Sequence, residues 1–308
     1  MVDFQESFRD ESSADTGEAG FELTDGSLIH VDYIAPPAAI SDYVTTLYHF
    51  RCDETLIRDI QPASIGHLAI FPRGKGEMHF RAGHKDPNHE VGVMTPLSTA
   101  NPIIVDGPFH AIGAALTPLG WAALTGLHAG EHRDRLRDAG EILGPQAVEM
   151  GQELIAHYRD GTMSGRDCAL ALGEFIGRNV KKINSRHAEL IKVVNAWLGS
   201  SFNPELSDLL ARAAYSERQV QRLTERYFGL SPQALARKYR ALRAAALLSF
   251  PKLTPEFEAE LGDAFFDQSH MIREINRFVG RTPARLKDPD NPYLSEMIAP
   301  KNLRELGN

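Results

Sequence analysis

Two stretches near the C-terminal end follow one plan, and this repeat constrains the fold more than any other feature. The first, from Ala213 to Pro232, reads AAYSERQVQRLTERYFGLSP; the second, from Ala264 to Pro283, reads AFFDQSHMIREINRFVGRTP. Each opens with a residue that can cap a helix, continues with apolar residues at helical spacing, and ends in glycine and, three positions on, proline. The pattern therefore predicts two helices of the same design.

Helical spacing gives each predicted helix an apolar and a polar face. The apolar faces hold Val220, Leu223, Tyr227 and Phe228 in the first helix and Met271, Ile275 and Phe278 in the second. The polar faces hold Arg218, Gln221, Arg222 and Glu225 in the first, and Ser269, Arg273 and Asn276, with Gln268 and Ile272 at the edges, in the second. A short amphipathic helix ending at Ala213 precedes the first copy. One copy alone would also fit a surface helix, but the repeat favours paired helix-turn-helix units suited to a DNA major groove.

On these residues, segment 187–287 resembles the DNA-binding domain of the AraC/XylS family of transcriptional regulators. The resemblance rests on YSERQVQRLTERYFGLSP and FDQSHMIREINRFVGRTP and covers about a third of the chain. It implies two helix-turn-helix units joined by a central helix, roughly Pro232 to Ser249, that enter successive major-groove segments on one side of a duplex. It also implies which side chains read base edges: Arg218, Gln221 and Arg222 in the first unit, and Gln268, Ser269, Ile272 and Arg273 in the second.

The chemistry of these side chains agrees with that role. Arg222 and Arg273 suit bidentate contact with guanine, and Gln221 and Gln268 suit adenine. Four further cations, Arg226, Arg237, Lys238 and Arg240, suit phosphates or solvent.

The net charge of −8 hides a division along the chain. Residues 1–186 carry −10, residues 187–287 carry +4, and the last 21 residues carry −2. Positive charge thus gathers where phosphate binding requires it. We expect double-stranded DNA as the main partner, with RNA polymerase and a small-molecule effector as further candidates.

From Phe21 to about Leu119 the sequence has the texture of a β-structure. Short apolar runs (27–33, 45–51, 66–71, 78–82 and 102–116) alternate with the turn clusters 36–37, 72–76, 85–88 and 106–108. This spacing predicts a β-sandwich or small barrel, and the segment resembles, less specifically, the cupin-like sensor domains of the same family. An interior pocket for a small ligand would be lined by Tyr48, Phe50, Phe71, Phe80, His110 and Trp121, unless these side chains simply fill a core.

The histidines define an alternative from another class, a metal-dependent cupin-like enzyme that carries a DNA-binding domain. His79, His84 and His89-Glu90 lie close together in the sequence, with His67 nearby. However, the His-x-His pair of the usual cupin pattern is missing, and the group lies in a Gly/Pro/Asn-rich loop, where solvated histidines are common. No P-loop, Gly-x-Ser-x-Gly or Cys-x-x-Cys motif occurs. We therefore expect no enzyme, no metal and no cofactor.

Residues from Pro118 to about Arg186 are predicted to be helical, over 121–128, 133–143, 145–159 and 167–184. The stripe Leu136, Ala139, Ile142 and Leu143 fits either a homodimer contact or packing on the sheet. The expected fold is α+β with two domains: a tail (1–20), a β-rich sensor-like domain (21–130), a helical connector (131–186), the DNA-binding domain (187–287) and a second tail (288–308).

The location expected from the sequence is the cytoplasm. The acidic start lacks the basic flank and apolar run of a signal peptide, and no stretch of about 20 apolar residues occurs. Cys52 and Cys168 are far apart in the sequence and lie in different sequence contexts. We therefore expect no structural disulfide between them, which fits a reducing compartment.

Overall fold

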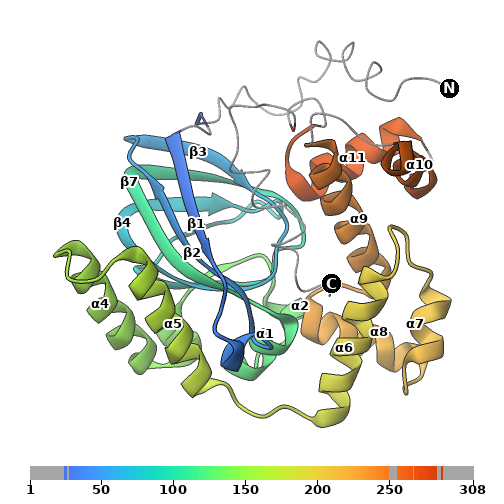
Figure 1. The fold of residues 1–308 in the computed structure, drawn as a ribbon, viewed down its shortest axis with the longest axis horizontal. Helices are drawn as coiled ribbons and strands as arrows, with labels where there is room; N and C mark the ends of the chain where they lie inside the picture. The colour runs from blue at the N-terminus through green and yellow to red at the C-terminus, as the bar shows by residue number, and fades with distance from the viewer. Residues whose placement is uncertain (1–23, 26–27, 250–254, 266, 283–285, 287–308) are drawn as a thin grey trace.

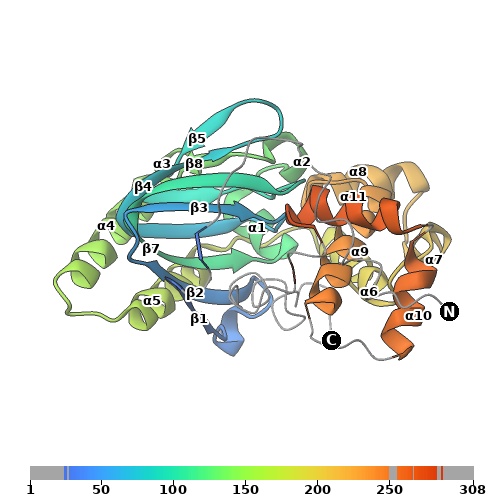
Figure 2. The same cartoon turned by 90° about the horizontal axis from the view of Figure 1, so that it is seen from above.

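The structure is a computed structural model that describes residues 24–25, 28–249, 255–265, 267–282 and 286. A curved antiparallel sheet with helices along one side forms the N-terminal part, and an all-helical C-terminal part packs beside it (Figures 1 and 2). Both predicted tails, the connection 250–254 and Pro283 lie outside the described residues. No helix in the described part of the chain is both long and apolar enough to cross a bilayer.

All pairings within the sheet are antiparallel. The strands lie in the order β1 (Ile29–Ile34), β2 (Val44–Cys52), β7 (Asn101–Leu116), β4 (His67–His79), β6 (Val91–Met94) and β8 (Leu136–Asp138). In addition, β3 (Leu56–Gln61) pairs with β7, and β5 (Lys85–Pro87) pairs with β4. The predicted α+β class and the β-rich N-terminal domain are confirmed.

Strands β4 and β7 run straight through two clusters predicted as turns, 72–76 and 106–108. The two clusters face each other in the ladder, where Lys75 pairs with Asp106, and the register of β4 shifts twice between Ile70 and Lys75. Gly74 has φ +83°, and a Cβ there would lie 2.8 Å from the carbonyl oxygen of Pro108. Glycine and proline therefore mark bulges here, not chain reversals. As a result β7 pairs with β2 through 109–116 and with β3 through 101–106, and the sheet curves around an interior (Figure 1).

The helices of the N-terminal part are α1 (Pro118–Thr125), α2 (Ala129–His132), α3 (Ala139–Leu143), α4 (Pro145–Arg159) and α5 (Gly165–Asn179). The helix predicted over 133–143 is wrong in its first half, because Leu136–Asp138 form strand β8. The predicted apolar stripe faces inward: Ala139 is buried in the core under the sheet, Ile142 and Leu143 pack against that core, and Leu136 packs beside Met78. Packing on the sheet thus accounts for the stripe, and no dimer contact is needed to cover it.

The C-terminal part consists of α6 (Ser185–Gly199), α7 (Leu206–Arg212), α8 (Glu217–Phe228), α9 (Pro232–Leu248), α10 (Pro255–Ala264) and α11 (Gln268–Val279). The predicted caps form: the backbone N–H of Ser216 donates to Gln219 (3.1 Å), and Asp267 accepts from the N–H of His270 (2.7 Å). Gly229 and Gly280 end α8 and α11 in the left-handed conformation, with φ of 85° and 80°. Two helix-turn-helix units, joined by α9, share one apolar core.

Candidate nucleic-acid interface and interior cavity

The two recognition helices present the predicted faces. Five of the seven predicted base-reading side chains are exposed (Arg218, Gln221, Arg222, Ser269 and Arg273), and Gln268 and Ile272 are half-buried. The apolar faces are buried, with Val220, Met271 and Ile275 at 0% exposure. Neither Arg222 nor Arg273 forms an ion pair with any residue that the structure describes. Both guanidinium groups are therefore available to an external acceptor.

The cations of α9 occupy different places from those expected. Arg237 and Arg240 both pair with the buried carboxylate of Glu274, at 2.7 Å each. Lys238 is only 2% exposed, and its Nζ donates to the carbonyl oxygen of Ser64 at 2.9 Å. Lys238 and Arg240 are buried, so the expectation that they suit phosphates or solvent is corrected for these two. Arg226, on α8, is exposed as expected, and Arg237 is exposed although it also pairs with Glu274.

The N-terminal part contacts the C-terminal end of each recognition helix. The Arg133 guanidinium donates to the carbonyl oxygen of Gly229, at the end of α8 (2.9 Å). At the end of α11, the carbonyl oxygens of Arg277 and Phe278 accept from the backbone N–H groups of Ala100 (3.0 Å) and Ala63 (2.8 Å). The last carbonyls of a helix have no partner within the helix, so these bonds complete both helix ends.

Two charged side chains are buried where α11 meets the sheet. Asp59, from β3, pairs with Arg281, and their side chains are 3% and 2% exposed. Because Ser64 accepts from Lys238 and Ala63 donates to Phe278, segment 59–64 is the main contact between the sheet and the second helix-turn-helix unit.

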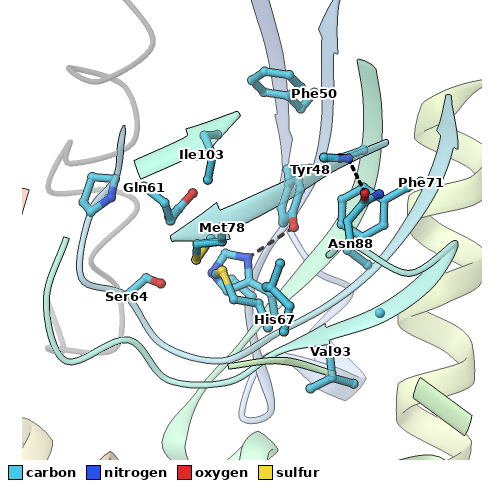
Figure 3. A pocket seen from close by; sticks show the side chains of 18 of the residues that line it. Tyr48, Phe50, Gln61, Ser64, His67, Phe71, Met78, Asn88, Val93 and Ile103 are labelled. Atoms are coloured by element: carbon cyan, nitrogen blue, oxygen red, sulfur yellow. Dashed lines mark hydrogen bonds between the residues drawn. The ribbon is translucent and has the colours of Figure 1, made fainter. Parts of the chain in front are cut away.

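A cavity of about 210 Å³ lies inside the curved sheet. Three of the predicted residues, Tyr48, Phe50 and Phe71, line it (Figure 3). The other lining residues include Val31, Gln61, Ser64, His67, Met78, Asn88, Val93 and Ile103, and Leu242 from α9. No local sequence pattern predicts the wall formed by 61–65 or the contribution of Leu242.

Phe80, His110 and Trp121 do not line the cavity, which corrects three of the six predictions. Phe80 stacks on His84 with ring centroids 4.6 Å apart. His110 alternates along β7 with two cavity-lining neighbours, so it points to the opposite face, where its Nδ1 lies 2.7 Å from the hydroxyl of Tyr158. Trp121 is buried in the core between α1 and the sheet.

Two of the polar side chains that line the cavity form a neutral pair. The Tyr48 hydroxyl lies 3.2 Å from Nδ1 of His67, and the two side chains meet in the interior (Figure 3). Burial, with a smaller effect of the Lys238 charge, lowers the pKa of His67 to about 4. Burial also raises the pKa of Tyr48. A neutral histidine and a protonated tyrosine together offer one hydrogen-bond donor and one acceptor to a ligand.

The charged side chains at the cavity wall are paired with opposite charges. Glu77 accepts from Lys85 at 2.8 Å, and Arg137 donates to Glu141 at 2.6 Å. The surroundings thus suit a mainly apolar molecule with one or two polar groups.

The histidines near residue 80 do not converge. His79 pairs with Glu77, His84 contacts the carbonyl oxygen of Asp134, and His89 lies 3.6 Å from Asp138. Within the described residues no group of three His, Cys, Asp or Glu side chains is arranged to hold a metal ion.

The family described as a helix-turn-helix domain matches residues 209–288. No curated protein matches the chain. Among solved structures, ToxT from Vibrio cholerae is 8% identical with a TM-score of 0.46, covering 83% of this chain and 97% of that chain. ToxT from Vibrio cholerae O395, bound to a naphthalenyl butenoic acid, is 9% identical with a TM-score of 0.46, covering 88% and 99%. The AraC-like transcriptional activator CuxR is 10% identical with a TM-score of 0.31, covering 71% and 87%. Likeness at this level supports no functional statement.

Two exposed recognition helices of one design, together with the family match over both, define a helix-turn-helix DNA-binding protein. The double unit joined by α9 resembles the AraC type of DNA-binding domain, as the sequence of segment 187–287 does.

Proposed function

We propose that the chain is a DNA-binding transcriptional regulator of the AraC type, and that it reads two successive major-groove segments on one face of a duplex, one with α8 and the other with α11. The observation that carries the proposal is the equivalence of the two exposed faces, with Arg222 and Arg273 in matching places and both without an ion-pair partner among the described residues. The residues proposed to read bases are Arg218, Gln221, Arg222, Gln268, Ser269, Ile272 and Arg273. The proposed domains are 21–130, 131–186 and 187–287.

Footprinting on the DNA upstream of the protein's own gene tests this proposal. One monomer should protect two major-groove segments about one helical turn apart on the same face. Protection of a single segment per monomer would contradict it.

We further infer that a small-molecule effector binds in the interior cavity. The cavity is mainly apolar, and Ser64, in its wall, also accepts the hydrogen bond from Lys238 of α9. An effector that displaces segment 61–65 of the cavity wall would change the contacts of that segment with α9 and α11. The displacement would thus alter both helix-turn-helix units although the effector does not touch DNA. If the chain activates transcription, RNA polymerase is a further partner that this function requires.

A matched pair of substitutions tests the cavity. Ile103 lines it, and the adjacent Ile104 on the same strand does not. With N-phenyl-1-naphthylamine as an uncharged fluorescent probe, Ile103→Trp should abolish binding, and Ile104→Trp should leave it as in the wild type. Equal binding by both variants would place the probe elsewhere and would overturn the cavity as the ligand site.

A further inference from the structure

A second cavity, of about 350 Å³, lies between the two parts of the chain, apart from the interior cavity. Its walls come from the end of α1, the linker between α5 and α6, and the last turn of α8. The lining residues are 122–127, Lys181, Lys182, Ile183, Asn184, His187, Arg226 and Tyr227. Three of these side chains are cations and none is a carboxylate.

Further positive charge connects this cleft to the reading face of α8. The guanidinium of Arg186 lies over the ring of Tyr215, 5.5 Å from its centroid, immediately before α8. His187 Nδ1 lies 2.7 Å from the hydroxyl of Tyr227. The pKa of His187 is lowered, mainly by burial and then by the charges of Arg226, Arg222 and Arg186. Positive charge is thus present at Arg222, at Arg226 in the cleft and at the two linker lysines.

We propose that this cleft binds phosphate, and that the phosphate comes from the DNA backbone beside the segment read by α8. The inference rests on the proposed mode of DNA binding, because Arg226 of the cleft lies one helical turn after Arg222 on α8. Lys181 and Lys182 precede both the matched segment 209–288 and the expected start of the DNA-binding domain at 187. The linker would thus be part of the DNA-binding surface as well as a tether.

The test uses the full chain with both linker lysines changed, Lys181→Ala/Lys182→Ala. Its control removes the same charge from two exposed cations outside the cleft, Arg166→Ala/Lys192→Ala. The slope of log affinity against log salt is negative, and each lost phosphate contact reduces its magnitude by about 0.9. For the linker variant the magnitude should therefore fall by about 1.8. Affinity at about 0.15 M salt should fall on the order of tenfold, equally for all sequences. The control should keep the wild-type slope.

A second arm separates the two sources of phosphate. Without DNA, binding of inorganic pyrophosphate to the full chain is measured by calorimetry. If the linker variant loses pyrophosphate binding but keeps the DNA salt slope, the cleft binds phosphate supplied by a small molecule, which overturns the DNA backbone as the source. If the variant changes neither, the phosphate site itself is overturned. Arg222→Ala measured in parallel keeps the outcomes separate: loss of sequence preference in that variant upholds α8 as a reader, whatever the linker lysines do.

Discussion

Asp59 of β3 and Arg281, just beyond the end of α11, form an ion pair buried between the sheet and the second helix-turn-helix unit. Removing one partner of such a pair leaves a desolvated charge, which costs about 3–5 kcal/mol. We expect Arg281→Met to lower the free energy of unfolding by about this amount, which is measured as a fall in the urea midpoint. The double change Asp59→Leu/Arg281→Met should recover most of the loss, since it buries no charge. An unchanged midpoint in the single variant would show that the pair is solvated.

The glycines that end the recognition helices should respond differently to alanine. Both have positive φ, so Gly229→Ala and Gly280→Ala each incur about 1–2 kcal/mol of backbone strain. A Cβ at 229 would meet Pro96 at 3.5 Å, an ordinary contact, whereas a Cβ at 280 would lie 2.2 Å from Ile60. We therefore expect Gly280→Ala to be the less stable variant by urea unfolding and to weaken the contact between α11 and the sheet. Equal stabilities would argue against a close contact at Ile60.

Arg222 and Arg273 should act in binding and not in folding. Substitution of an exposed side chain usually changes stability by no more than about 0.5 kcal/mol, so Arg222→Ala and Arg273→Ala should keep the wild-type Tm. Specific binding, measured by fluorescence anisotropy, should weaken by about 1–3 kcal/mol, with preference relaxed at one base position in each case. Arg240→Ala is the contrasting control. It removes an ion-pair partner from the buried carboxylate of Glu274, so it should lower Tm. If Arg273→Ala weakened all sequences equally, α11 would hold phosphate instead of reading bases.

The buried His67 makes stability depend on pH. Its pKa is about 4 in the folded protein and about 6.5 in an unfolded chain, so the unfolded state takes up a proton first as pH falls. Its neutral form thus contributes stability that is complete above about pH 6.5 and is lost between there and pH 4. His67→Gln should reduce the decline in unfolding free energy between pH 7.5 and 5, whereas changing the exposed His30 should not. A wild-type slope in His67→Gln would show that folding does not lower the pKa of His67.

The helical part could be predicted closely because its signals are local. The caps at Ser216 and Asp267, and the glycines at 229 and 280, lie within one turn of the helix ends that they fix. The burial of Arg240 has no local signal, because its partner Glu274 lies 34 positions away in the sequence. Helical periodicity carries no information at that distance.

The sheet was harder to predict for a different reason. Glycine and proline mark bulges as well as reversals, so the sequence does not show which of the two the clusters at 72–76 and 106–108 form. The strands are apolar on both faces, because helices cover one side and the cavity lies on the other. Alternation alone therefore did not reveal that His110 faces Tyr158 while Phe109 faces the cavity.

The two recognition helices do not depend equally on the rest of the chain. The end of α8 receives one side-chain bond, from Arg133, whereas two backbone carbonyls at the end of α11 take their partners from Ala63 and Ala100. A truncated regulator that begins at the linker would lose all three bonds, and most of the loss would fall on α11. The last turn of α11 would fray, and α8 would lose its packing against α1 and α2. Deletion of the N-terminal part would therefore disturb both recognition helices, and would change which DNA sequences are selected as well as how tightly they are held.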